Sequence, residues 1–219
     1  MMKRPILLLL ACLAVLPALA GPKKLDDMTA RLRQFHCISM RFSYTALQEM
    51  SATMPDTARW QDAVRGRLLV MDGRFKLYLP QMEILSDGHK TYQYLPGVKE
   101  INVMPVDTTA QTDITARPDL LLTRPGAFFD AVELPAGTDG RTAFLLTPRN
   151  RESSLYQSLI LWMDGKTGLP AALCAATSDG QVVAMGFSRI EDDRSADATS
   201  FTFRRADYPA DAEIIDMTF

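Results

Sequence analysis

Two strands and the turn that joins them can be read in residues 66–78, Gly66-Arg67-Leu68-Leu69-Val70-Met71-Asp72-Gly73-Arg74-Phe75-Lys76-Leu77-Tyr78. The Asp-Gly pair suits a tight hairpin turn, because glycine tolerates the positive φ angle that such turns demand and aspartate tolerates it better than most residues. Apolar and aromatic runs flank the pair on both sides, as they do in paired strands. We therefore expect antiparallel strands over residues 60–71 and 74–79.

The same turn signal recurs along the chain. Asp-Gly pairs also occur at 87–88, 139–140, 164–165 and 179–180, and most of them lie between apolar runs. Repeated signals of this kind predict repeated antiparallel reversals, so the protein should be mainly a β-meander. The further strands that we expect are 82–86, 90–95, 99–104, 128–134, 142–147, 156–163, 169–177, 181–190 and 199–205.

A helix should precede the strands. Leu25, Met28, Leu32 and Phe35 recur at helical spacing over residues 24–35. From Ile38 to Thr45 the period changes to two, with Ile38, Met40, Phe42 and Tyr44 alternating with polar residues. That pattern predicts a strand with one apolar face that points toward the core.

One segment interrupts the meander. Residues 117–126 hold the triplet Leu120-Leu121-Leu122 between Pro118 and Pro125. Proline fits the first turn of a helix and also stops one, so we expect one or two helical turns that cover an end of the sheet. The threonine-rich stretch from Val106 to Thr115 is expected to be a surface loop.

The first twenty residues have the pattern of a secretory signal peptide. Lys3 and Arg4 precede an apolar run over 6–16, and Ala18-Leu19-Ala20 provides small residues before a cleavage site at Gly21. We therefore expect a signal peptide over 1–20, a soluble exported domain over 21–219, and no span long enough to cross a bilayer. Leu9-Leu10-Ala11-Cys12 offers an alternative, a lipidation site that would anchor the chain through Cys12.

The composition excludes several classes of protein. The chain has 219 residues, of which 47% are hydrophobic and 23% charged, so disorder, collagen and coiled coil are excluded. Without residues 1–20 the net charge is −4, from 22 basic and 26 acidic side chains, and nucleic acid is not an expected partner. Cys37 and Cys174 could pair in an exported compartment, but two buried free thiols are the favoured interpretation.

No constellation of residues points to catalysis. His36 lies where the helix meets the first strand, and His89 follows the turn at 87–88. Neither histidine belongs to a nucleophile elbow, a zinc spacing or a phosphate loop, and no carboxylate dyad is evident. We expect no catalytic residue, metal or cofactor. The rival hypothesis, a hydrolase that acts on envelope lipids, would depend on one of the two histidines.

The chain has more apolar surface than one sheet face requires. Residues 67–71 and 159–163 contain consecutive apolar side chains, so both faces of those strands need a cover. A filled barrel interior with a packed helix outside would supply two covers. An incompletely filled barrel that takes up an apolar ligand is the alternative, and ten methionines after residue 20 would suit an adaptable wall.

The order of these segments resembles one known family, the LolA-type periplasmic carriers of outer-membrane lipoproteins. Residues 25–42, with Phe35-His36 at the junction, are similar to the family's opening helix and first strand. Residues 66–78 look like its Gly-x-Leu strand and the partner of that strand, and 84–94 resemble its Ser-Asp-Gly hairpin with two aromatics. Phe201-Thr202-Phe203 and Glu213-Ile214-Ile215-Asp216 resemble its closing strand and acidic tail.

The resemblance implies a fold and a site. The fold would be a single, strongly curved, incomplete antiparallel β-barrel of about 11 strands, with short helices as a lid over an apolar cavity. The lid residues would be Leu25, Met28, Leu32, Leu120, Leu121 and Leu122. Inward parity suggests Met40, Phe42, Leu68, Val70, Phe75 and Leu77 as the wall that binds acyl chains.

The resemblance also implies a function. The protein would be a monomeric periplasmic carrier, not an enzyme, that shields the acyl chains of lipoproteins or related lipids between the inner and the outer membrane. Its partners would be an inner-membrane lipoprotein-releasing transporter and an outer-membrane acceptor. A lipid-anchored receptor or envelope-stress sensor of the same fold is the alternative. Enterobacterial relatives latch the lid with an arginine where this chain has Asp72, so the resemblance does not extend to the latch residue.

Overall fold

A computed structural model describes residues 22–60, 62–106, 117–135 and 140–218. Three predictions lie outside these ranges: the signal peptide over 1–20, the lipidation site at Cys12, and all but the first residue of the loop expected from Val106 to Thr115. Within the described part of the chain, no helix is both long enough and apolar enough to span a membrane.

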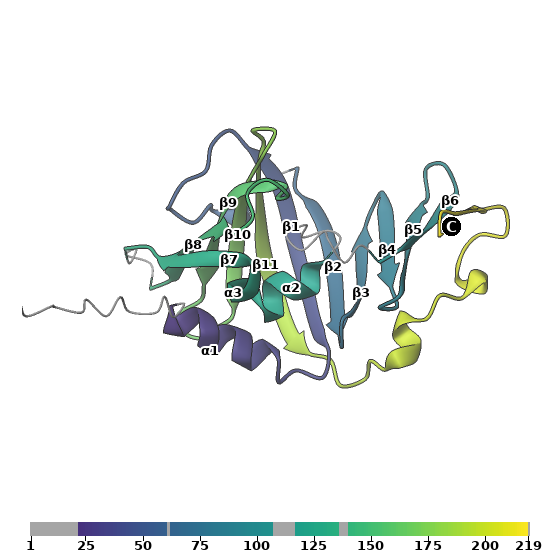
Figure 1. Cartoon of the computed structure of the whole chain (residues 1–219), viewed down its shortest axis with the longest axis horizontal. Coiled ribbons are helices and arrows are strands. Elements are labelled where there is room, and N and C mark those ends of the chain that lie inside the picture. The colour runs from purple at the N-terminus through teal and green to yellow at the C-terminus, as the bar shows by residue number, and fades with distance from the viewer. Residues whose placement is uncertain (1–21, 61, 107–116, 136–139, 219) are drawn as a thin grey trace, which may run out of the picture.

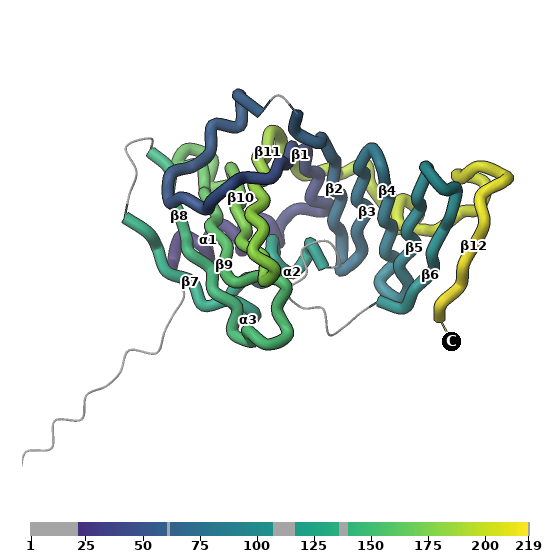
Figure 2. The backbone as a smooth tube through the Cα atoms, turned by 90° about the horizontal axis from the view of Figure 1, so that it is seen from above, coloured from purple at the N-terminus to yellow at the C-terminus, as the bar shows by residue number. Residues whose placement is uncertain are grey.

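The described strands form one open sheet of 12 strands, in the order β12-β6-β5-β4-β3-β2-β1-β11-β10-β9-β8-β7. All neighbours are antiparallel except β12 and β6, which pair in parallel at one edge. The part around β1 and β7–β11 curls about the helices, whereas β5, β6 and β12 extend away from them (Figures 1 and 2). The strands are β1 Ile38–Leu47, β2 Val64–Met71, β3 Arg74–Leu79, β4 Met82–Ser86, β5 Lys90–Leu95, β6 Glu100–Pro105, β7 Phe129–Glu133, β8 Thr142–Pro148, β9 Tyr156–Met163, β10 Pro170–Thr177, β11 Val182–Asp192 and β12 Glu213–Asp216.

This architecture confirms the predicted fold, a mainly β protein built on an incomplete barrel, with two corrections. The strand expected over 199–205 is wrong. That segment forms the short 3-10 helices η2 (Ala198–Phe201) and η3 (Arg205–Asp207), because the Asp197 carboxylate accepts hydrogen bonds from the amides of Thr199 and Ser200 and so starts a turn. Residues 213–216, expected as an acidic tail, form β12 beside β6.

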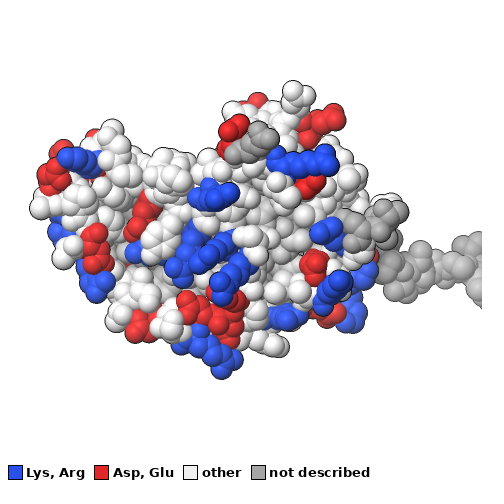
Figure 3. Space-filling view, turned by 180° about the vertical axis from the view of Figure 1, so that it is seen from behind, with Lys and Arg blue, Asp and Glu red and all other residues white. Residues whose placement is uncertain are grey.

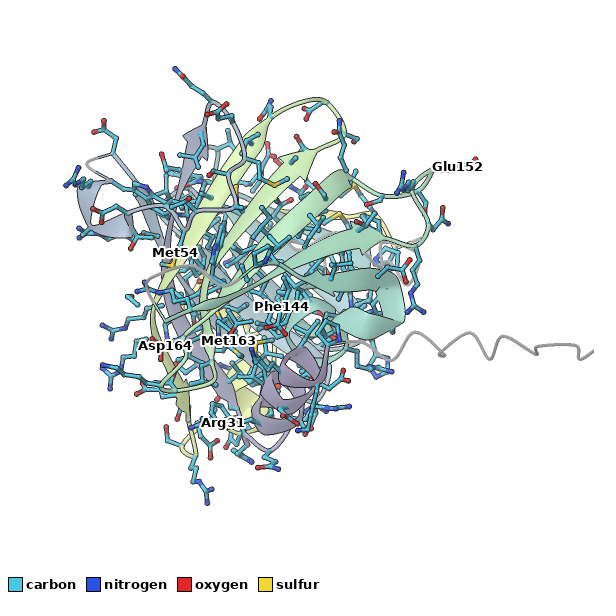
Figure 4. The ribbon with its side chains drawn as sticks, turned by 90° about the vertical axis from the view of Figure 1, so that its left-hand side faces the viewer. Arg31, Met54, Phe144, Glu152, Met163 and Asp164 are labelled. Atoms are coloured by element: carbon cyan, nitrogen blue, oxygen red, sulfur yellow. The ribbon has the colours of Figure 1, made fainter. Side chains whose placement is uncertain are left out.

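The described residues form three short α-helices, and these lie on the concave side of the sheet (Figure 1). α1 (Lys23–Leu32) buries Leu25, Met28 and Leu32 and ends three residues before the predicted boundary at Phe35. Its Arg31 donates a hydrogen bond to the carbonyl of Thr167 in the β9–β10 turn, the turn that also carries Asp164 (Figure 4). α2 (Pro118–Thr123) and α3 (Pro125–Phe128) each begin with a proline, which fits the first helical turn.

The apolar residues divide between the two faces of the sheet. On the concave face one large cluster joins α1 and α2 to strands on both sides of β1. On the convex face, residues 196–203 cover Leu69, Met71 and Leu85, and the loop after β1 places Met50, Met54 and Trp60 over β8–β11. Both faces therefore have the cover that the apolar surplus in the sequence requires.

The two thiols lie in different convex-face clusters, Cys37 in the first and Cys174 in the second. Both are free and buried, which confirms the favoured interpretation over a disulfide. Burial raises the pKa of both thiols, and Asp193 contributes further at Cys37.

Candidate functional site

A hollow of about 310 Å³ lies on the concave face between the middle of the sheet and α2. Its walls come from β1–β4 on one side, β9–β11 on the other, and α2 above. Among the described residues that line it, none is charged and most are aliphatic, aromatic or sulfur-containing. The lining residues are Met40, Phe42, Tyr44, Leu68, Leu77, Leu79, Gln81, Met82, Pro118, Leu121, Leu122, Tyr156, Leu173, Ala175, Thr177, Val183, Met185 and Phe187.

The pairing of β1 with β11 brings the two halves of this wall together. In register, Phe42 faces Phe187 and Tyr44 faces Met185. A bulge in β11 after Phe187 shifts the register between Arg41 and Phe42, yet it leaves the apolar side chains of both strands on the concave face. The wall therefore continues across strands that are far apart in the sequence.

Gly66 explains how the ring of Phe42 fits into this wall. A Cβ atom at position 66 of β2 would overlap that ring and also crowd Leu79 of β3. Glycine therefore lets an aromatic side chain lie flat against the neighbouring strand, which is the close approach that glycine in a strand often marks. The Gly-x-Leu pattern thus places Phe42 and Leu68 on the same wall.

The polar atoms of the hollow gather at one end. The Gln81 side-chain amide donates a hydrogen bond to the Tyr44 hydroxyl over 3.1 Å. Tyr156 begins β9 and Thr177 ends β10, so these four side chains come from the same end of the sheet. The opposite end of the concave face is filled by α1 and by aromatic residues such as Phe144 (Figure 4). A guest with an apolar body and an uncharged polar head matches this distribution.

α2 covers the hollow through apolar side chains. Leu121 and Leu122 face the hollow, and both are buried. The Arg117 guanidinium pairs with Asp119 through two hydrogen bonds of 3.1 Å, and the Thr123 hydroxyl donates to the Asp119 carbonyl. Within the described part of the chain, the side-chain hydrogen bonds of α2 therefore stay inside its own segment and do not tie it to the sheet.

The structure places the residues predicted for the site in two groups. Met40, Phe42, Leu68 and Leu77 line the hollow, whereas Val70 and Phe75 lie in the same core cluster without lining it. Of the predicted lid, Leu121 and Leu122 line the hollow. Leu120 is buried elsewhere, and Leu25, Met28 and Leu32 of α1 pack in the core cluster away from the lining. Acyl-chain binding and lid movement at these residues stay predictions.

Sequence reasoning missed the half of the lining that β9–β11 supply. The alternation of Val183, Met185 and Phe187 was present in the sequence. Without the β1–β11 register, however, nothing in the sequence indicated that the apolar face of β11 continues the apolar face of β1.

Both histidines lie away from the hollow. The His36 ring lies 2.8 Å from the Ala196 carbonyl, where the C-terminal segment leaves the sheet, and its backbone amide donates to Asp192. His89 follows Asp87, whose carboxylate accepts the backbone amide of His89. The described residues contain no group of histidine, cysteine and acidic side chains suited to a metal ion. Asp72, at the position of the family's latch arginine, lies exposed in the β2–β3 turn with φ 50°.

Known proteins that share one name are similar to the chain in sequence. No family model matches the chain. A protein of Chromohalobacter salexigens named outer-membrane lipoprotein carrier protein is 32% identical over 163 residues, 72% of each chain. One of the same name from Azotobacter vinelandii is 25% identical over 206 residues, 92% of this chain and 93% of that one.

Two solved structures are also similar to the chain. A LolA superfamily protein of Nitrosomonas europaea superposes with a TM-score of 0.42 at 15% identity, over 83% of this chain and 95% of that one. A putative outer-membrane lipoprotein-sorting protein domain of Vibrio parahaemolyticus superposes with a TM-score of 0.49 at 10% identity, over 83% of this chain and 96% of that one.

Proposed function

The chain belongs to the family of outer-membrane lipoprotein carrier proteins, and from this membership we propose that it carries lipoproteins, or related lipids, by holding their acyl chains in the hollow under α2. The observation that carries the proposal is the hollow itself, a space of about 310 Å³ that the described side chains line without a charge and leave unfilled. The relatives are named as carriers rather than as enzymes.

The volume indicates what the hollow can hold. If a methylene group takes roughly the 30 Å³ that a water molecule occupies in the liquid, the hollow accommodates about ten methylene groups of one acyl chain. At about 0.8 kcal/mol for each buried methylene, those ten groups represent roughly 8 kcal/mol against exposure to water. Transfer from a bilayer exchanges one apolar environment for another, so loading and release stay close to balance.

The walls and the cover take separate roles in this proposal. Met40, Phe42, Leu68 and Leu77 contact the acyl chain, with Val70 and Phe75 as the layer behind them. Leu121 and Leu122 on α2 cover the chain, and α2 moves aside to admit it and to make room for further acyl chains. Leu25, Met28 and Leu32 belong to α1, which forms the second helix of the lid at the filled end of the concave face.

The route follows from the family's name and from the sequence. Residues 1–20 direct export, cleavage near Ala20-Gly21 releases residues 21–219 as one carrier domain, and the protein works in the periplasm as a monomer. It receives its cargo from an inner-membrane transporter and delivers it to an outer-membrane acceptor. Binding and release account for the whole activity, and no covalent step is required of the carrier.

Extraction of a lipopeptide from vesicles tests this function. Vesicles that contain a fluorescent diacylated lipopeptide are mixed with the protein and removed by flotation, and the lipopeptide left in solution is measured. We expect soluble lipopeptide to rise with protein up to one per chain, and Phe42→Asp to abolish the rise, because a buried charge opposes an acyl chain. A wild-type sample that leaves all lipopeptide with the vesicles would contradict the proposal.

A further inference from the structure

Three arginines lie side by side across neighbouring strands on the convex face of the sheet. Arg41 of β1 is the register partner of Arg67 on β2 and also of Arg189 on β11. Arg65 lies on the same face, opposite Ser43 of β1. The convex placement follows from parity, because Met40, Phe42 and Leu68 face the hollow on the other side. We call Arg41, Arg65, Arg67 and Arg189 the arginine strip, and basic side chains gather in the middle of this face in Figure 3.

The arginine strip is exposed and only partly neutralised. Arg189 pairs with Glu191 over 2.8 Å, and Arg67 lies 3.8 Å from the Asp193 carboxylate. Among the described residues, Arg41 and Arg65 form no ion pair. Like charges directly opposite one another destabilise a sheet. This concentration of positive charge is confined to one part of the surface, because the whole chain has a net charge of −2.

Two covering segments border the arginine strip. On one side the loop after β1 lies over β11, where Thr57 contacts Gly186. On the other side residues 196–203 cover Leu69 of β2, which is the next convex position after Arg67. The exposed arginines therefore lie on a band of bare sheet between two raised segments. A narrow, extended partner reaches them more readily than a flat surface does.

We propose that the arginine strip is a docking site for an acidic, extended segment of a partner protein. Arginine presents a planar fork of donors that matches a carboxylate, so a row of arginines suits a chain of Asp and Glu side chains. A planar anionic membrane would meet the raised segments first, together with Glu191 and Asp193 beside the arginine strip. The site lies on the face opposite the hollow, so this proposal stands whether or not the hollow binds lipid.

The test uses a fluorescein-labelled decapeptide in which glutamate and glycine alternate, with anisotropy measured at about 20 mM and about 150 mM salt. We expect saturable binding that weakens with salt. The double variant Arg41→Gln/Arg65→Gln should raise the dissociation constant about tenfold, the equivalent of roughly 1.4 kcal/mol. The control Arg33→Gln/Arg151→Gln removes the same charge from exposed positions elsewhere and should change it less than twofold.

Thermal unfolding keeps the test independent of folding defects. Because Arg41 faces two like charges, Arg41→Gln should raise Tm by about 1–3 °C while it weakens peptide binding. Equal losses in the two double variants, or no binding of the peptide at low salt, would overturn the proposal. It would also be overturned if vesicles rich in phosphatidylglycerol, rather than the peptide, bound in a manner that the arginine-strip variant abolishes.

Discussion

The two faces of the sheet are both rich in apolar residues, but the described segments cover the apolar residues of the convex face closely and leave a hollow on the concave face. On the convex face small side chains, among them Ala143, Ala172 and Ala184, allow the loop after β1 to pack closely, and residues 196–203 cover the apolar cluster of β2 and β4. On the concave face bulky side chains meet α2 and still leave a hollow of about 310 Å³. The comparison teaches that an excess of apolar residues indicates a binding site only where the protein's own side chains do not pack against them.

The largest effect should come from removing a convex-face cover. Phe201 of η2 is fully buried against β2 and β4, so Phe201→Ala should lower the free energy of unfolding by about 3–5 kcal/mol. Urea unfolding followed by fluorescence measures this loss. Lipid binding per folded molecule should not change, because the hollow lies on the other face. A variant that kept its stability but lost lipid would reverse the roles that we give to the two faces.

Adjacent residues on β2 provide a sharper contrast, because Leu68 lines the hollow and Leu69 packs under residues 196–203. Leu69→Ala opens a void in a closed cluster and should cost about 2–5 kcal/mol. Leu68→Ala only enlarges an existing hollow, so its cost should lie near the transfer term of about 2 kcal/mol. Equal unfolding free energies for the two variants would indicate that the hollow is filled in solution.

Replacing a small side chain by a larger one tests whether unfilled space is present on each face. Ala172 and Ala175 lie on opposite faces of β10, the first among close-packed neighbours and the second on the wall of the hollow. Ala172→Leu should cost about 1–3 kcal/mol through overpacking, whereas Ala175→Leu should be tolerated within about 1 kcal/mol and weaken lipid binding. Unfolding midpoints and titration with a fluorescent fatty-acyl probe measure the two responses. A destabilised Ala175→Leu would show that no free space exists there.

The smallest effect should be the pH dependence of stability that comes from Asp193, just before the covering residues 196–203. The Ser195 hydroxyl and amide donate to Asp193 and hold the pKa of its carboxyl below the ordinary value of 3.8. A lowered pKa stabilises the folded state above pH 4 and ceases to do so as the pH falls through the lowered value. Asp193→Asn should therefore reduce the urea midpoint at pH 7 and differ less from wild type at pH 3, below the ordinary pKa of 3.8, than at pH 7. A constant difference at both pH values would exclude this carboxylate as the cause.

The sequence predicted the positions of the strands better than it predicted which strands lie side by side. The Asp-Gly turns and the period-two runs located eleven of the twelve strands, because both signals are local. The strand expected over 199–205 failed, because an aspartate cap competed successfully with strand pairing at a segment that packs on the sheet rather than within it. β12 was missed, because its partner lies across a long connection at the sheet edge.

The candidate site divides in the same way. Parity along β1–β3 placed Met40, Phe42, Leu68 and Leu77 on the wall, but it could not show how deep the hollow extends, so Val70 and Phe75 lie behind the lining. The wall from β9–β11 depends on the pairing of β1 with β11, two strands separated by most of the chain. Register over such a separation is set by tertiary packing, which no short stretch of sequence records.

Native mass spectrometry of the exported protein tests the central claim most directly, with Ala175→Trp as a variant in which the hollow is plugged and Arg33→Gln as a control on the surface. We predict a lipid or lipopeptide adduct of one per chain on the wild type and on Arg33→Gln, and bare polypeptide for a folded Ala175→Trp. An adduct that persists on the plugged variant, or a wild type that stays bare when lipopeptide is added, would contradict the account.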